Sequence, residues 1–230
     1  MTTRSLISLA LFSTLCALTA SATAEPYWIT YEGNDFPENE GWTRFTGAGG
    51  ADRWIEDGAL VIDSLHDVHI HDVTAMERWM DPDLGELFVA EWRLLVEEES
   101  DEWDPGVGIA RSFDPGFVEF HFGPESAWNA LDNQWWEIEP GVFHTYRFES
   151  HNMIDFDFFI DDQLVQEGTF LSPSSNQSFI AFGDMFDGRA SLSRWDYVRF
   201  GVVPEPETGI LALATGIGVV KRLKRREISR

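Results

Sequence analysis

Two pairs of polar residues have types and spacing that suit acid/base chemistry. Glu119 and His121 flank one aromatic residue, and Glu91 and Arg93 flank another. Because successive side chains of a strand point to opposite faces, each pair would share one face of a sheet. A groove lined by all four side chains is a candidate site for general acid/base catalysis. The competing interpretation is a solvated sheet face with cross-strand ion pairs.

Four carboxylates in two acidic segments are candidate calcium ligands. Ca²⁺ prefers carboxylate and carbonyl oxygens from flexible loops. Asp101 and Asp104 lie in one such segment, and Asp184 and Asp187 lie in the other. Neither segment has the spacing of an EF-hand, so the alternative interpretation is a pair of solvated acidic loops.

Two histidines form a second, separate metal candidate. His69 and His71 would share a strand face, where two imidazoles could supply one edge of a zinc site. A structural zinc site needs four ligands, and no third ligand follows at a suitable spacing.

Tryptophans beside polar segments are candidates for sugar binding, because an aromatic face packs well against the C–H groups of a sugar ring. An exposed Trp is otherwise unfavourable and suggests a binding role. Trp135 and Trp136 are adjacent, so on a strand one would enter the core and the other would point outward. The candidates are Trp103, Trp128, Trp135 and Trp136. Core packing is the alternative for each of them.

Short strands are the elements that must position these residues. Polar and apolar residues alternate most clearly in residues 88–96, 116–122 and 153–160. Shorter runs of the same kind are residues 59–63, 67–73, 107–110, 143–149, 163–169, 179–183 and 193–202. Turn-forming residues such as Asp57 and Gly58 separate these runs. The pattern predicts an all-β fold, a two-sheet antiparallel jelly-roll sandwich.

The charge is concentrated in the body of the chain. Of 40 acidic and 16 basic residues in the 230, 37 acidic but only nine basic ones lie in residues 25–203, a net charge of −28 there. Such a surface repels phosphate backbones, which excludes nucleic-acid binding. The same range holds 31 of the 32 aromatic residues, which argues against disorder. Residues 25–202 are therefore expected to form one folded domain.

The N-terminus has the features of an export signal. Arg4 precedes an apolar run at residues 6–20, and Ala22 and Ala24 supply the small residues of a cleavage site. This order is typical of a signal peptide over residues 1–24, with the Sec translocon as partner. The single cysteine, Cys16, lies in the segment to be removed, so the mature protein would contain no disulfide.

The C-terminus, residues 203–230, combines three features. Pro204, Glu205 and Pro206 are followed by an apolar run at residues 209–220 and a basic cluster at residues 221–226. We interpret them as a stiff spacer, a short hydrophobic helix and a basic cluster that stays in the cytoplasm. The apolar run is 12 residues long, whereas an independent span needs about 20.

This arrangement resembles the PEP-CTERM sorting signal of Gram-negative bacteria, with Pro204, Glu205 and Pro206 as its motif. The resemblance implies processing by an exosortase-type protease after transient anchoring in the inner membrane by the helix. It also implies release of the protein to the cell surface or extracellular matrix.

The body of the chain resembles laminin-G and concanavalin A-like domains of bacterial surface proteins. The segments that carry the resemblance are Gly41 and Trp42, residues 53–60, residues 88–93, Gly183 and Asp184, and residues 195–200. It implies a jelly roll whose members often bind carbohydrate or protein and often carry calcium.

The glycan-cleaving signatures known on this fold are not met. The glucanase pattern Glu-x-Asp-x-x-Glu is absent from the strands, and so is the lyase triplet Gln-Ile/Val-His. The sequence therefore favours a non-catalytic module that binds polysaccharide or belongs to a biofilm matrix. A glycan-active hydrolase or lyase using the polar sheet face, and a purely structural matrix component, remain as alternatives.

Overall fold

The computed structural model describes residues 27–46, 50–66, 72–76, 87–100, 107–112, 117–152, 154–171, 179–185 and 190–203. All of them belong to one compact unit, Pro26–Val203. The expected signal peptide and the residues of the sorting motif, Pro204, Glu205 and Pro206, lie outside the described residues. Within the described ranges, no helix is long and apolar enough to cross a membrane.

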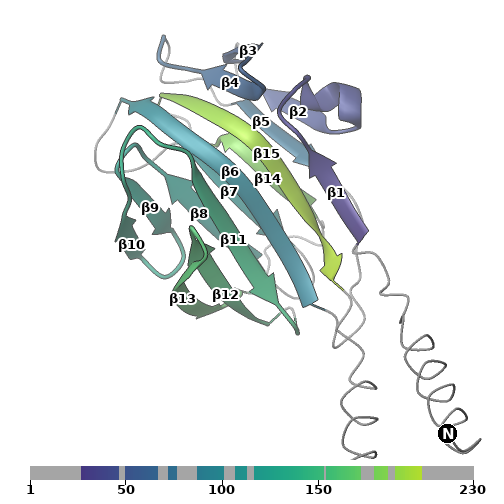
Figure 1. Cartoon of the computed structure of the whole chain (residues 1–230), viewed down its shortest axis with the longest axis vertical. Coiled ribbons are helices and arrows are strands. Elements are labelled where there is room, and N and C mark those ends of the chain that lie inside the picture. Colours follow the sequence, from purple (N-terminus) through teal and green to yellow (C-terminus); the bar gives the residue numbers. More distant parts are fainter. Residues whose placement is uncertain are drawn as a thin grey trace, which may run out of the picture. The chain divides into compact units, whose positions relative to one another are not determined.

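Eight strands form one antiparallel sheet, in the order β13-β12-β11-β6-β15-β4-β3, with β1 also paired to β15. The long strands β6 and β15 run side by side through its middle (Figure 1). Their bounds and those of the other members are β1 (Tyr27–Tyr31), β3 (Asp52–Glu56), β4 (Ala59–Asp63), β6 (Leu87–Glu99), β11 (His144–Ser150), β12 (Asp155–Ile160), β13 (Gln163–Thr169) and β15 (Ser191–Val203).

Seven strands form the second antiparallel sheet, in the order β10-β9-β8-β7-β14-β5-β2. Its members are β2 (Thr43–Thr46), β5 (Asp72–Met76), β7 (Val107–Ser112), β8 (Phe117–Phe122), β9 (Ser126–Asn129), β10 (Gln134–Glu137) and β14 (Phe179–Asp184). A single turn of 3-10 helix, η1 (Pro37–Glu40), precedes β2.

The two sheets pack face to face through aromatic side chains. Trp92 of β6 is fully buried, with its ring centroid 6.2 Å from that of Phe120 on β8. Phe120 stacks on Phe158 of β12 at a centroid separation of 4.0 Å. Because β6 and β12 belong to one sheet and β8 to the other, these contacts join the two layers. Each such ring buries about 150–250 Å², so they contribute much of the core's stability.

Tight turns join neighbouring strands where the sequence places turn-forming residues. Asp57 and Gly58 have φ values of 52° and 80° between β3 and β4, and Asp161 and Asp162 have 48° and 62° between β12 and β13. Positive φ at both central residues defines the turn whose twist matches a two-residue hairpin. Asp161 of the second turn also lines a surface groove.

The predicted all-β, two-sheet antiparallel fold is confirmed. Every segment with alternating polar and apolar residues contains or overlaps a strand; residues 88–96 lie within β6, and β12 lies within residues 153–160. The strands that alternation did not mark include β9 and β10, which are only four residues long. These two strands carry the tryptophans of the candidate site.

Candidate functional site

Glu119 and His121 share the outer face of the seven-stranded sheet. The intervening Phe120 is fully buried in the core, so its two neighbours point the other way. His121 Nε2 lies 3.1 Å from Glu119 Oε1, and the two side chains are 5% and 17% exposed. The spacing in the sequence thus produces a real carboxylate–imidazole pair, largely shielded from water.

Trp128 and Trp135 lie on the next two strands and form a row of rings with His121. His121 is paired with Trp128 in the β8–β9 ladder, and Trp128 is paired with Trp135 in the β9–β10 ladder. The edge of one ring meets the face of the other for His121 and Trp128, with centroids 4.8 Å apart. Trp128 and Trp135 stack at 4.8 Å with an interplanar angle of 10°. The row ends at Trp135, whose side chain is 43% exposed.

The indole N–H of Trp128 is buried and has no hydrogen-bond partner among the described residues. A buried donor without an acceptor is unfavourable, by about 1–3 kcal/mol.

Trp136 points to the opposite side of β10 from Trp135. Its ring packs against the core, with its centroid 5.3 Å from that of Phe158. The expectation that one of the two adjacent tryptophans enters the core is confirmed. Trp136 also lines a surface groove, so it is both a core and a surface residue.

A groove of about 660 Å³ lies where the edge strands of the two sheets approach each other. We call it the edge groove. Its lining residues come from β10 and the segment after it, from the start of β11, from the end of β12 and its turn, and from β13: Trp135, Trp136, Glu137, Ile138, Glu139, His144, Ile160, Asp161, Gln163 and Val165. Trp135 therefore belongs both to the row of rings on the sheet face and to the edge groove.

His144 contacts two sides of the edge groove, at Asp161 and at Glu139. Its Nδ1 lies 2.6 Å from Asp161 Oδ2, and its Nε2 lies 2.8 Å from the carbonyl oxygen of Glu139. Both ring nitrogens are therefore within hydrogen-bond distance of an acceptor. Asp161 also accepts a hydrogen bond from the backbone N–H of Thr145 at 2.9 Å. His144 thus contacts both the turn after β12 and the segment that contains Glu139.

The expectation that Glu91 and Arg93 join Glu119 and His121 in one groove is wrong. Glu91 and Arg93 lie on β6, in the eight-stranded sheet, and their intervening Trp92 faces the core. The two polar pairs therefore occupy opposite outer surfaces of the sandwich. Alternation assigns a side chain to a face of its own strand, but it does not say in which sheet that strand lies.

The outer face of the eight-stranded sheet is an ion-pair network around Glu91. Tyr197 Oη donates a hydrogen bond to Glu91 Oε1 at 2.7 Å, and Arg199 and Arg147 also pair with this carboxylate. Burial, followed by the hydrogen bond to Glu91, raises the pKa of Tyr197 to about 12. Arg93 pairs with Asp196. The competing interpretation, a solvated face with cross-strand ion pairs, therefore describes Glu91 and Arg93.

Asp184 does not lie on a solvated loop, as a calcium ligand was expected to do. It is fully buried at the end of β14, where its carboxylate accepts hydrogen bonds from Ser64 and Ser191. The other calcium candidates, Asp101, Asp104 and Asp187, lie outside the described residues. Among the residues that are described, no three His, Cys, Asp or Glu side chains are grouped to hold a metal ion.

Three further candidates also fall in parts of the chain that are not described. These are Trp103, His69 and His71, so their predicted roles in sugar and zinc binding stay predictions.

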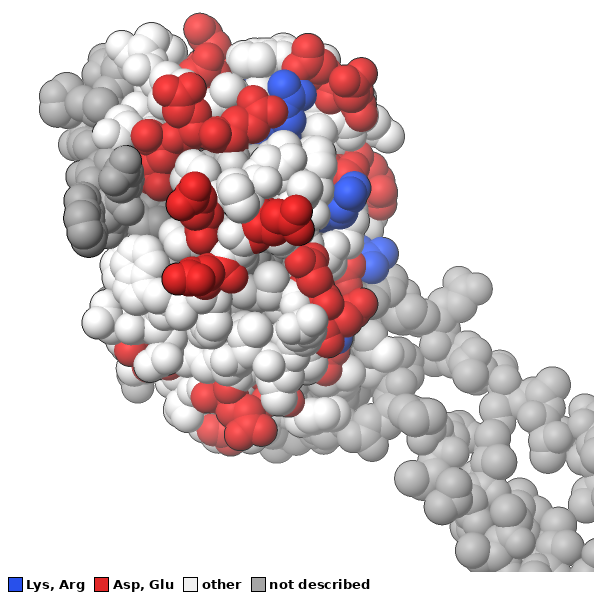
Figure 2. Space-filling model, turned by 60° about the vertical axis from the view of Figure 1, so that its left-hand side comes forward, with Lys and Arg blue, Asp and Glu red and all other residues white. Residues whose placement is uncertain are grey.

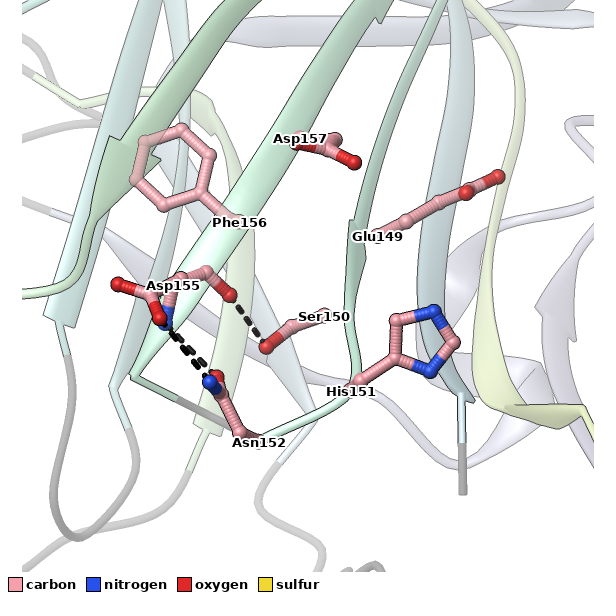
Figure 3. A pocket seen from close by; sticks show the side chains of 7 residues that line it. All are labelled: Glu149, Ser150, His151, Asn152, Asp155, Phe156 and Asp157. Atoms are coloured by element: carbon pink, nitrogen blue, oxygen red, sulfur yellow. Dashed lines mark hydrogen bonds between the residues drawn. The ribbon is translucent and has the colours of Figure 1, made fainter. Parts of the chain in front are cut away.

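A smaller hollow of about 120 Å³ lies at the turn between β11 and β12 (Figure 3). Its polar groups hold the turn itself. Asn152 Oδ1 accepts a hydrogen bond from the backbone N–H of Asp155 at 2.8 Å, and Ser150 Oγ donates to the Asp155 carbonyl at 2.6 Å. These contacts give Ser150, Asn152 and Asp155 a structural role in the turn.

Comparison with solved structures places the fold among lectin-like sandwiches. The structure is similar to a carbohydrate esterase of the Shiga toxin-encoding bacteriophage phi24B (TM-score 0.57, 13% identity, 76% of this chain and 97% of that one). It is also similar to a protein of unknown function from Shewanella oneidensis MR-1 (TM-score 0.52, 10% identity, 84% and 93%). Peanut lectin matches with a TM-score of 0.50 at 10% identity, over 78% and 98%.

No family model and no curated protein matches the chain. At these identities the structural likeness establishes the fold alone. The protein has a concanavalin A-like jelly-roll fold.

Proposed function

We propose that the protein is a glycan-binding module and that Trp128, Trp135, His121 and Glu119 form its binding surface. The observation that carries this proposal is the stacked tryptophan pair, which ends in a ring that is 43% exposed. An exposed indole face packs against the C–H face of a sugar ring. The carboxylate of Glu119, which is 17% exposed, supplies acceptor oxygens for its hydroxyls, and His121 supports the Trp128 ring.

The row of rings is held rigidly, which favours binding over a loose surface patch. Trp135 rests on Trp128, and Trp128 rests on His121, each across a ladder of paired strands. A ring that is already ordered loses little conformational entropy when a ligand binds. Fold likeness to a carbohydrate esterase and to peanut lectin agrees with this proposal.

A glycan array tests the proposal directly. The purified protein is expected to bind a defined subset of printed glycans and to lose this binding when Trp135 is replaced by Ala. Absence of binding to every glycan would contradict the proposal and would favour the purely structural alternative.

A glycan-active enzyme is a second candidate, and the contact between Glu119 and His121 favours it. A carboxylate and an imidazole at 3.1 Å are groups that can transfer protons. Product analysis after incubation with each array hit separates the two candidates. New reducing ends or released acyl groups, lost in the variant Glu119→Gln, would indicate catalysis, whereas unchanged glycans indicate binding alone.

The delivery of the protein is proposed from its termini. Residues 1–24 would direct export through the Sec translocon, and Pro204, Glu205 and Pro206 would mark processing by an exosortase-type protease. The acidic, lysine-free body agrees with a place at the cell surface or outside the cell. Mass spectrometry of the exported protein is expected to show a start near Glu25 and loss of the C-terminal segment. An intact C-terminus would contradict the sorting proposal.

Calcium remains part of the proposal through Asp101, Asp104 and Asp187. A cation that binds only the folded state raises its melting temperature by mass action. Millimolar calcium is expected to raise the melting temperature relative to sodium chloride at equal ionic strength. Equal melting temperatures would contradict calcium binding by the folded protein.

A further inference from the structure

Trp135 joins two surfaces that differ in shape. On the outer face of the seven-stranded sheet it ends the row formed with Trp128 and His121. In the edge groove it forms one wall, beside Trp136. A ligand that stacks on Trp135 is therefore adjacent to both surfaces at once.

The edge groove is large and its walls are fixed. Its volume of about 660 Å³ falls within the range of about 300–1,000 Å³ found for small-molecule sites. The His144 clasp joins Asp161 to the segment containing Glu139. On the adjoining side, Gln166 of β13 accepts a hydrogen bond from Asn129 at 3.0 Å and donates one to Asp132 at 2.8 Å. These bonds hold β13 against the β9–β10 hairpin, so the groove is preorganised.

The groove combines aromatic and polar groups in the way that sugars require. Trp135 and Trp136 supply ring surface, and Gln163 lies exposed at the start of β13 with an amide that can both donate and accept. The carboxylates of Glu137 and Glu139 are acceptors for hydroxyl groups. No lysine or arginine is among the residues that line the edge groove.

The negative charge of the two surfaces favours uncharged glycans over anionic ones. Glu119 lies on the sheet face, and Glu137, Glu139 and Asp161 line the edge groove. Figure 2, turned so that the side carrying β9 and β10 in Figure 1 comes forward, shows acidic side chains spread over this aspect of the molecule and basic ones along one margin. Uronate or sulfate groups would be repelled by this surface.

Four arginines lie on the eight-stranded sheet, and each is paired with a carboxylate there. They are Arg93, Arg147, Arg194 and Arg199. Among the described residues, these four are the basic residues on the outer surface of the eight-stranded sheet. The tryptophan row lies on the other sheet.

We propose that the protein binds several consecutive sugars of an uncharged glycan chain, with one subsite on the Trp128–Trp135 row and a second subsite in the edge groove. This inference rests on the proposed glycan binding and adds the length and charge class of the ligand. Trp135 contacts the chain at the junction of the two subsites, and Gln163 contacts it in the groove.

The test uses a glycan array that carries each backbone in lengths of two, four and six sugars, in uncharged form and in uronate or sulfated form. Affinity for uncharged glycans is expected to rise at least tenfold from two to six sugars. The anionic forms are expected to bind at least tenfold more weakly at 50 mM salt, and this difference should shrink at 500 mM salt.

Two substitutions on β13 separate the subsites. Gln163→Trp fills the edge groove and is expected to lower affinity for six-sugar glycans to the level of two-sugar glycans, without changing two-sugar binding. Leu164→Trp is the matched control, because Leu164 is 50% exposed on the same strand and does not line the groove. It is expected to bind all lengths as the unchanged protein does. Circular dichroism and melting temperature confirm that both variants fold.

The possible failures are distinguishable. Length-independent binding, tighter binding of anionic glycans, or an unchanged length dependence in Gln163→Trp would overturn the two-subsite inference while leaving glycan binding intact. No binding to any glycan of either charge would overturn the proposed function itself, and this inference with it.

Discussion

Trp128 and Trp135 face each other across the β9–β10 ladder with ring centroids 4.8 Å apart and ring planes only 10° from parallel. Such an offset or parallel pair contributes about 0.5–1.5 kcal/mol beyond the area it buries. The stack supports Trp135 from one side while 43% of its surface stays exposed. The exposed ring is thus a fixed part of the sheet surface.

Trp136→Ala is expected to destabilise the fold by about 3 kcal/mol, because it removes a large ring that packs on Phe158 in the core. Trp135→Ala should cost less than this, because 43% of the Trp135 surface is already exposed in the folded protein. Urea unfolding monitored by circular dichroism measures both changes. Equal losses of stability would show that the adjacent side chains do not divide between core and surface.

Gly33→Ala is expected to be far more harmful than Gly141→Ala. The two glycines have similar φ values, 71° and 75°, so both substitutions carry the cost of a left-handed residue, about 1–2 kcal/mol. A methyl group at Gly33 would also collide with the carbonyl oxygens of Asp196 and Trp195, whereas at Gly141 nothing lies within 4 Å. Thermal denaturation of the two variants should therefore differ by several degrees. Similar melting temperatures would contradict the close approach at Gly33.

Asp72→Asn is expected to cost about 3–5 kcal/mol, because Asp72 is fully buried and pairs with Arg44 and Arg53. The substitution would leave the Arg53 side chain, which is 4% exposed, near a neutral amide. The control is Asp162→Asn, which breaks a pair with Arg147 at 2.8 Å where Asp162 is 82% exposed. That loss should be below about 1 kcal/mol. Comparable costs in chemical denaturation would refute the buried character of the Asp72 cluster.

Stability is expected to fall as the pH rises above 10. Burial raises the pKa of Tyr31 and Tyr146 far above the ordinary value of 10, and burial together with Glu91 raises that of Tyr197 to about 12. Between pH 10 and 12 the unfolded chain loses these protons while the folded chain keeps them, so unfolding is favoured.

Absorbance at 295 nm measures this tyrosine ionisation. The signal of the native protein should stay small at pH 10 to 11 and rise steeply on unfolding, whereas the chain in urea should titrate near pH 10. Native and urea-denatured proteins with the same titration curve would rule out buried tyrosines.

Much of the fold follows from local patterns in the sequence. Trp92 and Phe120 are recognised as core residues because polar side chains flank them at a period of two, and the turn at Asp57 and Gly58 follows from residues that tolerate positive φ. These features depend on neighbouring residues along the chain, which a single sequence displays directly.

The site could be predicted only in part, because it depends on which strands become neighbours. The shared face of Glu119 and His121 is local, but their separation from Glu91 follows from the strand order of two sheets. The pairing of Trp128 with Trp135 depends on the register of two four-residue strands, which are too short to show alternation. The edge groove brings together residues from β10 and β13 that are distant in sequence.

The central claim is that Trp135 is the main contact for a glycan. Isothermal titration calorimetry with the best uncharged hit from the glycan array measures it, comparing the unchanged protein with Trp135→Ala and Trp54→Ala. Trp54 is the matched control, because it is 37% exposed on β3 in the other sheet.

We predict that Trp135→Ala weakens binding at least tenfold, about 1.4 kcal/mol, while Trp54→Ala leaves the affinity unchanged. Retention of full affinity by Trp135→Ala, or an equal loss in Trp54→Ala, would contradict the account.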